Sequence, residues 1–171
     1  MSRTPLRRTA LLVAGYAAVY AGFCLWIHAG GHTPSAPSPL VSPSKQYLVQ
    51  AVLLVPASLL IWGLVGATVH AVARALGGHG DRAATLAEVG RAWAAPTLVV
   101  FVLPDVVTYA VGGFEAIAKT TRLTAPLTLV LVCVLMHFAV RRTHGLSGLR
   151  AALAVVAGIV VLGALHGPWL R

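Results

Sequence analysis

Charged side chains, and acidic ones above all, are scarce in this sequence. Asp and Glu account for 4 of its 171 residues, and charged residues make up 10% of the chain, against about 25% in an ordinary soluble domain. This polar surface is too small to cover a water-facing globule, which excludes a soluble fold. The chain is instead 58% hydrophobic, which indicates an integral membrane protein.

Cysteine is also rare, and the 2 residues present, Cys24 and Cys133, both lie in apolar runs. Their spacing fits neither a disulfide framework nor a zinc site, so we expect no metal and no cofactor. Catalytic signatures are missing as well. The stretch GGHGD (77–81) lacks the Gly-Lys-Ser/Thr ending of a phosphate-binding loop, and no serine occupies a nucleophile elbow. We therefore expect a protein that is not an enzyme.

Five apolar runs reach, or nearly reach, the roughly 20 residues that a membrane-spanning helix needs. They are residues 9–27, 47–73, 92–113, 123–140 and 151–167. The sequence thus predicts an all-α bundle of five transmembrane helices. We expect the first run to be retained as a span, because its apolar stretch exceeds the roughly 7–15 residues of a signal peptide. A linker rich in Pro, Ser and Gly (28–44) separates it from the second run.

Basic residues, which give the chain a formal net charge of +9, fall unevenly between these runs. If the N-terminus is cytoplasmic, nine lie inside and four outside: Arg3, Arg7, Arg8, Arg74, Arg82, Arg91, Arg141, Arg142 and Arg150 against Lys45, Lys119, Arg122 and Arg171. Positive charge concentrates in cytoplasmic loops, so we expect a cytoplasmic N-terminus and a C-terminus outside, in the plasma membrane. Because the basic residues lie between spans and not along one patch, we expect no nucleic-acid partner.

A shift of 67 residues aligns the two predicted inner turns with each other. The matching positions are Leu64, Val65, His70, Arg74, Gly78, Ala84, Leu86, Ala87 and Val89, against Leu131, Val132, His137, Arg141, Gly145, Ala151, Leu153, Ala154 and Val156. Because the second and fourth spans both run inward, this is a parallel repeat of two-helix hairpins. In each turn a glycine closes one helix, and Asp81 or Ser147 is placed to cap the next.

Two further features lead to local predictions. Residues 82–93 read as a short helix in the membrane interface, with Trp93 at headgroup depth. Residues 114–122 read as a short outer loop. Small residues recur at helical spacing and are expected to let helices pack closely within the bundle, or else to build an oligomer face; they are Ala14, Ala18 and Gly22, and Gly63, Ala67 and Ala71.

Two stretches share a basic turn followed by a span. The first, WGLVGATVHAVARALGGHGDRAATLAEVGRAWAAPTL (62–98), contains a span, a Gly-Gly turn, a short helix and a Pro-led third span; the second is MHFAVRRTHGLSGLRAALAVV (136–156). In this pattern the chain resembles the Yip family of Ypt/Rab-interacting multi-pass membrane proteins, in particular its short bacterial-type members. The resemblance implies a four-helix Yip-like membrane domain over residues 47–171, preceded by the first span and its linker (1–46). Eukaryotic members are associated with vesicle traffic and small GTPases.

Asp105 is the sharpest candidate for a functional residue. It follows Pro104 inside the third span, where a carboxyl group is costly unless it is paired, protonated or facing a cavity. His28, Lys45 and His166 are candidate partners near the outer side. Two interpretations stay open: a proton, ion or substrate site, or an aspartate that fixes helix packing.

The inner histidines form a second candidate group: His70, His79, His137 and His144. They could converge if the two hairpins pack together, and imidazole suits several transition metals. Their spacing matches no standard ligand pattern, so we expect histidines at helix ends and no metal site.

The composition, the spans and the resemblance together predict a non-enzymatic membrane protein of the Yip type. We expect it to act in membrane organisation or in contacts with lipid or a partner. The bilayer and its anionic headgroups are the predicted partners, contacted through Arg74, Arg82, Arg141 and Arg142, together with a membrane-protein partner or a second copy of the chain. The alternative is a small transporter or channel component that uses Asp105.

Overall fold

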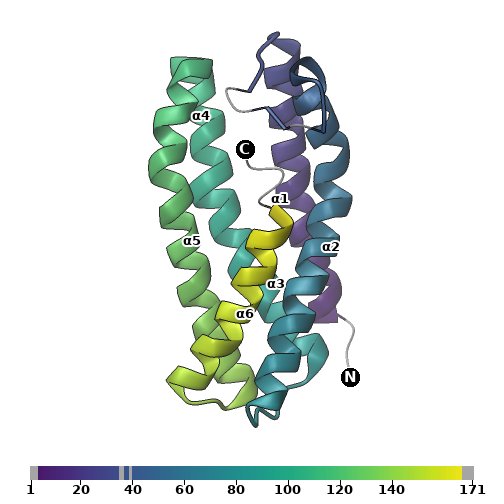
Figure 1. Cartoon of the computed structure of the whole chain (residues 1–171), viewed down its shortest axis with the longest axis vertical. Coiled ribbons are helices and arrows are strands. Elements are labelled where there is room, and N and C mark those ends of the chain that lie inside the picture. Colours follow the sequence, from purple (N-terminus) through teal and green to yellow (C-terminus); the bar gives the residue numbers. More distant parts are fainter. Residues whose placement is uncertain (1–3, 35–36, 39, 167–171) are drawn as a thin grey trace.

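The computed structural model describes residues 4–34, 37–38 and 40–166, and this part of the chain consists of helices and connecting turns. The helices are α1 (Thr4–Ala29), α2 (Gln46–Ala75), α3 (Arg82–Pro96), α4 (Leu103–Gly112), α5 (Phe114–His144) and α6 (Gly148–His166), shown in Figure 1. Within the described residues, five helical stretches are long and apolar enough to cross a membrane. The predicted fold class, an all-α bundle of five spans, is confirmed. The direction in which the chain crosses the membrane stays a prediction.

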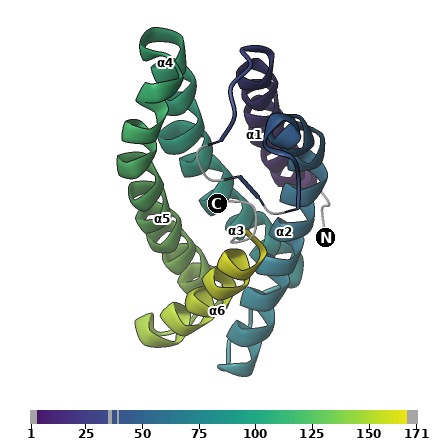
Figure 2. The ribbon, with the colours of Figure 1, turned by 45° about the horizontal axis from the view of Figure 1, so that its top comes forward.

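The central helix of the bundle is α3, which packs against α1, α2 and α5. The last helix, α6, packs against α2 and α5. Figure 2 shows α1 and α2 on one side of the molecule and α4 with α5 on the other. Because α4 is joined to the bundle mainly through α5, the two sides meet chiefly through α3 and α6.

The α2–α3 and α5–α6 turns lie at the same end of the bundle, the lower end in Figure 1, as a parallel hairpin repeat predicts. We call this the turn end, defined by residues 76–81 and 145–147. Left-handed glycines close both helices, Gly77 with φ 88° and Gly145 with φ 66°, because glycine adopts this conformation without a Cβ clash. The structural match is therefore shifted by one residue from the sequence alignment, which pairs Gly78 with Gly145.

The second half of each hairpin begins differently. Asp81 has an extended backbone, and its side chain accepts a hydrogen bond of 3.0 Å from the Ala84 N–H, which confirms the predicted cap. Ser147 directly precedes α6, and its backbone carbonyl accepts the Ala151 N–H at 3.0 Å. The side chain of Asp81 thus caps α3, as predicted, whereas the bond described at Ser147 is made by its backbone carbonyl.

The third span is continuous from Arg82 to Gly112. A π-helical segment, η2 (Thr97–Val102), joins α3 to α4, and the Leu103 N–H bonds the Leu98 carbonyl five residues back. Pro104 follows, and a proline cannot donate the hydrogen bond that a regular helix requires. The wider turn gives the backbone an alternative pairing just before the proline, so the span continues across it.

Two local predictions were wrong. Residues 114–122 do not form a loop: α5 begins at Phe114, and a single glycine, Gly113 with φ 74°, separates it from α4. Residues 82–93 do not form a separate short helix: they begin the third span, which is continuous from Arg82 to Gly112, and Trp93 is 6% exposed, with its ring meeting that of Tyr16 edge-on at 5.5 Å. The apolar side of 82–93 faces other helices and not the lipid surface, which the sequence pattern alone does not distinguish.

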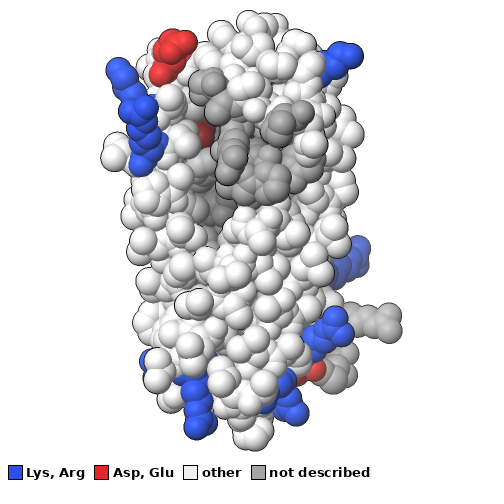
Figure 3. All heavy atoms as spheres, viewed as in Figure 1, with Lys and Arg blue, Asp and Glu red and all other residues white. Residues whose placement is uncertain are grey.

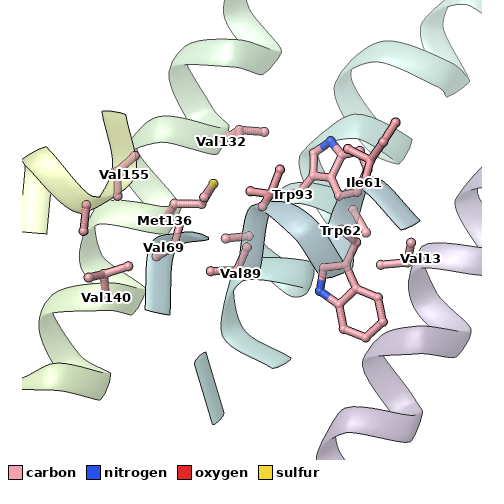
Figure 4. Packing of buried hydrophobic residues seen from close by; sticks show 14 of the residues in the cluster. Val13, Ile61, Trp62, Val69, Val89, Trp93, Val132, Met136, Val140 and Val155 are labelled. Carbon is pink, nitrogen blue, oxygen red and sulfur yellow. The ribbon is translucent and has the colours of Figure 1, made fainter. Parts of the chain in front are cut away.

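The core is built from side chains of five helices, seen around Val69, Val89 and Met136 in Figure 4. Lipid tails are as apolar as these side chains, so close packing, more than the hydrophobic effect, holds such helices together. Gly90 provides the closest approach: a Cβ there would collide with Thr9 of α1 and the Trp62 ring of α2.

Within the described residues, the glycines of the two small-residue stripes do not make such close contacts. A Cβ at Gly22 or at Gly63 would meet nothing within 4 Å. Ala18 and Ala71 are exposed. The close contacts fall on glycines outside both stripes, Gly66, Gly90 and Gly158, which each face a side chain of another helix.

Candidate functional site

Asp105 lies in the first turn of α4 and is buried, with 2% of its surface exposed. The Thr121 hydroxyl of α5 donates to the carboxyl group and lies 3.3 and 3.2 Å from its two oxygens. Next to this contact, the hydroxyls of Thr108 and Thr120 are 2.9 Å apart. These side chains form a polar seam that ties α4 to α5.

The partners predicted for Asp105 are not those found in the described part of the chain. No ion pair or hydrogen bond described there joins Asp105 to His28 or Lys45. The side chain of His166 lies outside the described residues, as do Arg3 and Arg171. The arrangement favours a packing role for Asp105, because its hydroxyl partner belongs to the helix that α4 packs on.

A second buried polar group lies at the turn end, where α2, α3 and α5 meet. His144, the last residue of α5, is 2% exposed. Its Nδ1 accepts the Gly80 N–H at 3.2 Å, and its Nε2 lies 2.8 Å from the Thr85 hydroxyl of α3. His70 of α2 reaches the same hydroxyl through its Nδ1 at 3.2 Å. We call His70, Gly80, Thr85 and His144 the histidine network.

The proton positions in the histidine network follow from its donors. A backbone N–H can only donate, so the Nδ1 of His144 is an acceptor and the ring proton is on Nε2. The Thr85 hydroxyl donates to the Asp81 carbonyl at 2.8 Å, and therefore accepts from both His144 and His70. Each buried polar atom in this chain of bonds has a partner, and a satisfied network of this kind fixes the relative position of its helices.

The predicted convergence of the four inner histidines is thus confirmed for two of them. The ring centroids of His70 and His144 are 5.4 Å apart, whereas the rings of His79 and His137 do not join the network. Within the described residues, no three His, Cys, Asp or Glu side chains are grouped to hold a metal ion. His70 and His144 converge on the Thr85 hydroxyl, and their hydrogen bonds join the two turns. Thr85 and Gly80 were missed, because nothing in the sequence marks a threonine or a glycine as the partner of a distant histidine.

The four arginines predicted to contact lipid all lie close to the turn end and are exposed: Arg74, Arg82, Arg141 and Arg142. Figure 3 shows several Lys and Arg side chains gathered at this lower end. Arg142 pairs with Glu88 of α3 at 3.1 Å, and Arg91 pairs with the same carboxylate. These arginines belong to the two hairpins that the histidine network joins. The network therefore fixes the backbone positions of the arginines relative to one another.

The family model described as Yip1 domain matches residues 1–170. No curated protein and no solved structure matches the chain. The match includes the first span as well as the four later ones.

Proposed function

Since the chain belongs to the Yip family of multi-pass membrane proteins, we propose that it is a non-catalytic organiser of the plasma membrane. In this proposal the turn end faces the cytoplasm and contacts anionic lipid headgroups. The observation that carries it is the convergence of exposed arginines from both hairpins on one end, above the buried histidine network.

Physical chemistry supports this role for the turn end. The cytoplasmic leaflet carries a negative surface potential, and each Lys or Arg near it contributes about 1 kcal/mol of attraction. Arg74 and Arg82 flank the first turn, and Arg141 and Arg142 precede the second, so four cations act together. Because the network fixes both turns, little conformational entropy is lost when they meet the headgroups. A second copy of the chain or another membrane protein is a further partner in this proposal.

Reconstitution in nanodiscs tests the proposed function. The full chain is placed in discs of dioleoyl phosphatidylcholine, with and without dioleoyl phosphatidylglycerol, and its melting temperature is measured at low and high salt. We expect stabilisation by the anionic lipid that weakens with salt. Changing the four arginines that flank the turn end, Arg74, Arg82, Arg141 and Arg142, to Gln should abolish the difference. Changing Lys45, Lys119 and Arg122 to Gln should leave most of it, and equal loss in both variants would contradict the proposal.

A second candidate function, transport through Asp105, is favoured by the burial of a carboxyl group inside a span. Proton flux into liposomes that contain the full chain tests it. Flux that is lost in Asp105→Asn and kept in Thr121→Val would support transport, whereas liposomes no leakier than empty ones would contradict it.

A further inference from the structure

Two shallow apolar grooves run along α5, one on each side of Phe138. The first lies between α3 and α5 and is floored by Ala92, Leu135 and Ala139. The second lies between α5 and α6 and is lined by side chains such as Val156. Their volumes are about 470 and 460 Å³. Phe138 lines both grooves and is 59% exposed, so it forms a ridge between them.

The first groove ends at a charged rim. Arg142 is four residues beyond Phe138, which places both on the same face of α5. Arg91 and Glu88, from α3, complete the rim. Glu88 accepts from one nitrogen of Arg142 and one of Arg91. A guanidinium carries five N–H donors, and the three groups sum to a net charge of +1, so donors and positive charge remain for an anion.

The order of these features, a cationic rim followed by two apolar grooves, matches the order of parts in a phospholipid. Along a helix, four residues correspond to roughly 6 Å. If Arg142 lies among the headgroups, the grooves lie at the depth where acyl chains begin. Two apolar grooves that share one ridge suit two acyl chains, and a pair of guanidinium groups suits a phosphate.

We propose that an anionic diacyl glycerophospholipid sits astride Phe138, with one acyl chain in each groove and its phosphate at Arg142 and Arg91. This inference rests on the proposed function, because it requires the turn end to face an anionic leaflet. It goes further by assigning a defined site and a lipid class, where the proposed function needs only diffuse attraction.

Native mass spectrometry of the full chain in detergent tests the lipid class. The probes are dioleoyl phosphatidylglycerol, its one-chain lyso form, dioleoyl phosphatidylcholine and inorganic phosphate. We expect the two-chain anionic lipid to bind about tenfold tighter than either the lyso form or phosphatidylcholine, since each lacks a contact worth roughly 1.4 kcal/mol or more. Equal binding of the lyso form would overturn the two-groove arrangement. Inorganic phosphate that competes for the same site at similar affinity would reduce it to a simple anion site and overturn it as well.

Matched variants test the residues. Arg142→Gln should weaken phosphatidylglycerol binding about tenfold. Arg141→Gln is an identical change of charge at a residue that lines neither groove, and in detergent it should weaken binding less than about threefold. Phe138→Ala should weaken it about fivefold, and Leu127→Ala, an exposed residue of α5 outside both grooves, should have little effect. All four side chains are exposed, so the variants should melt like the parent protein in lipid-free detergent. Should Phe138→Ala unfold, Phe138→Leu replaces it and should show an intermediate loss.

The outcomes separate this site from the proposed function. Equal losses in Arg141→Gln and Arg142→Gln, with the preference for anionic lipid kept in nanodiscs, would remove the site and leave the proposed function standing. Absence of any anionic preference in nanodiscs would remove both. A dimer that binds no lipid and is broken by Phe138→Ala would assign the grooves to a second copy of the chain, and would overturn the lipid assignment.

Discussion

At the turn end the two hairpins are joined by directed hydrogen bonds, whereas at the opposite end α1 meets α4 through contacts between rings. His144 bonds Gly80 and Thr85 there, and the backbones of His79 and His144 bond each other at 3.2 Å. At the opposite end, the Tyr109 ring of α4 meets Phe23 and Trp26 of α1 at 5.7 and 4.7 Å. A hydrogen bond requires a distance and a direction, but a ring contact tolerates rotation and sliding. The turn end is therefore the fixed end, and the contact of α1 with α4 at the opposite end is the adaptable one.

Further ring contacts close the end of the bundle opposite the turn end. The linker residue His32 stacks on Phe114 at 4.5 Å with an angle of 6° between the rings, and Tyr47 meets the same ring edge-on. These contacts close the opposite end without a described hydrogen bond between α1 and α4. The fixed end carries the exposed arginines, so the face with the most concentrated charge is also the one with the best defined geometry.

The largest effect is expected from His144→Ala. This change leaves the Gly80 N–H without its partner, removes one of the bonds to the Thr85 hydroxyl, and opens a cavity where a buried ring lay. An unpaired buried group costs about 1–3 kcal/mol, and a cavity adds to that cost. We expect the free energy of unfolding in detergent to fall by about 3 kcal/mol. His137→Ala, on the same helix and outside the network, should cost less than about 1 kcal/mol. Equal losses in the two variants would show that the network does not hold the turn end.

Gly90→Ala tests the packing that lies between the two ends. The added methyl group would meet Thr9 and Trp62, and overpacking of this kind costs about 1–3 kcal/mol. Gly22→Ala is the matched control, because a Cβ there meets nothing within 4 Å. It should leave thermal stability unchanged or raise it by up to about 1 kcal/mol, since alanine is the better helix former. A stabilising Gly90→Ala would mean that α1, α2 and α3 cross less closely than described.

Tyr109→Ala should have a smaller effect, about 1 kcal/mol, because ring contacts contribute about 0.5–1.5 kcal/mol each and the neighbouring rings can repack. Tyr109→Phe keeps the ring and should match the parent protein. Chemical denaturation followed by the fluorescence of Trp26 and the other tryptophans measures both. A loss in Tyr109→Ala as large as that in His144→Ala would remove the contrast between the ends.

The smallest effect is expected from Asp105→Asn. The amide keeps an oxygen that can accept the Thr121 hydroxyl, and side-chain hydrogen bonds between membrane helices contribute about 0.6 kcal/mol on average. Melting temperature should therefore change little, whereas Asp105→Leu should lower it. Loss of a transport activity in Asp105→Asn, with the fold intact, would favour the second candidate function over the packing role.

The architecture could be read from the sequence because it depends on composition and periodicity. Runs of apolar residues predicted all five spans, and the motif around Gly77 and Asp81 predicted the first turn and its cap. The predictions that were wrong concern features that depend on which face of a helix meets another helix. Trp93 and the segment 114–122 have sequences that fit an interface or a loop, and only the packing of α3 and α5 decides between these outcomes.

The candidate site was harder to predict from the sequence, because it also depends on which helix faces meet. The convergence of His70 and His144 could be anticipated from the repeat, but their shared partner Thr85 lies 59 residues from His144. Likewise, the grooves beside Phe138 arise from the spacing of three helices. No local pattern encodes such a spacing, whereas the arginines near both turns are visible in the sequence.

Both turns should lie on the same side of the membrane, because the histidine network fixes them to each other. Single cysteines at Arg82 and at Arg142, in a chain that lacks Cys24 and Cys133, can be labelled with a membrane-impermeant maleimide in intact cells and in inverted vesicles. We expect both positions to be protected in intact cells and labelled in inverted vesicles. Labelling of the two positions from opposite sides of the membrane would contradict it.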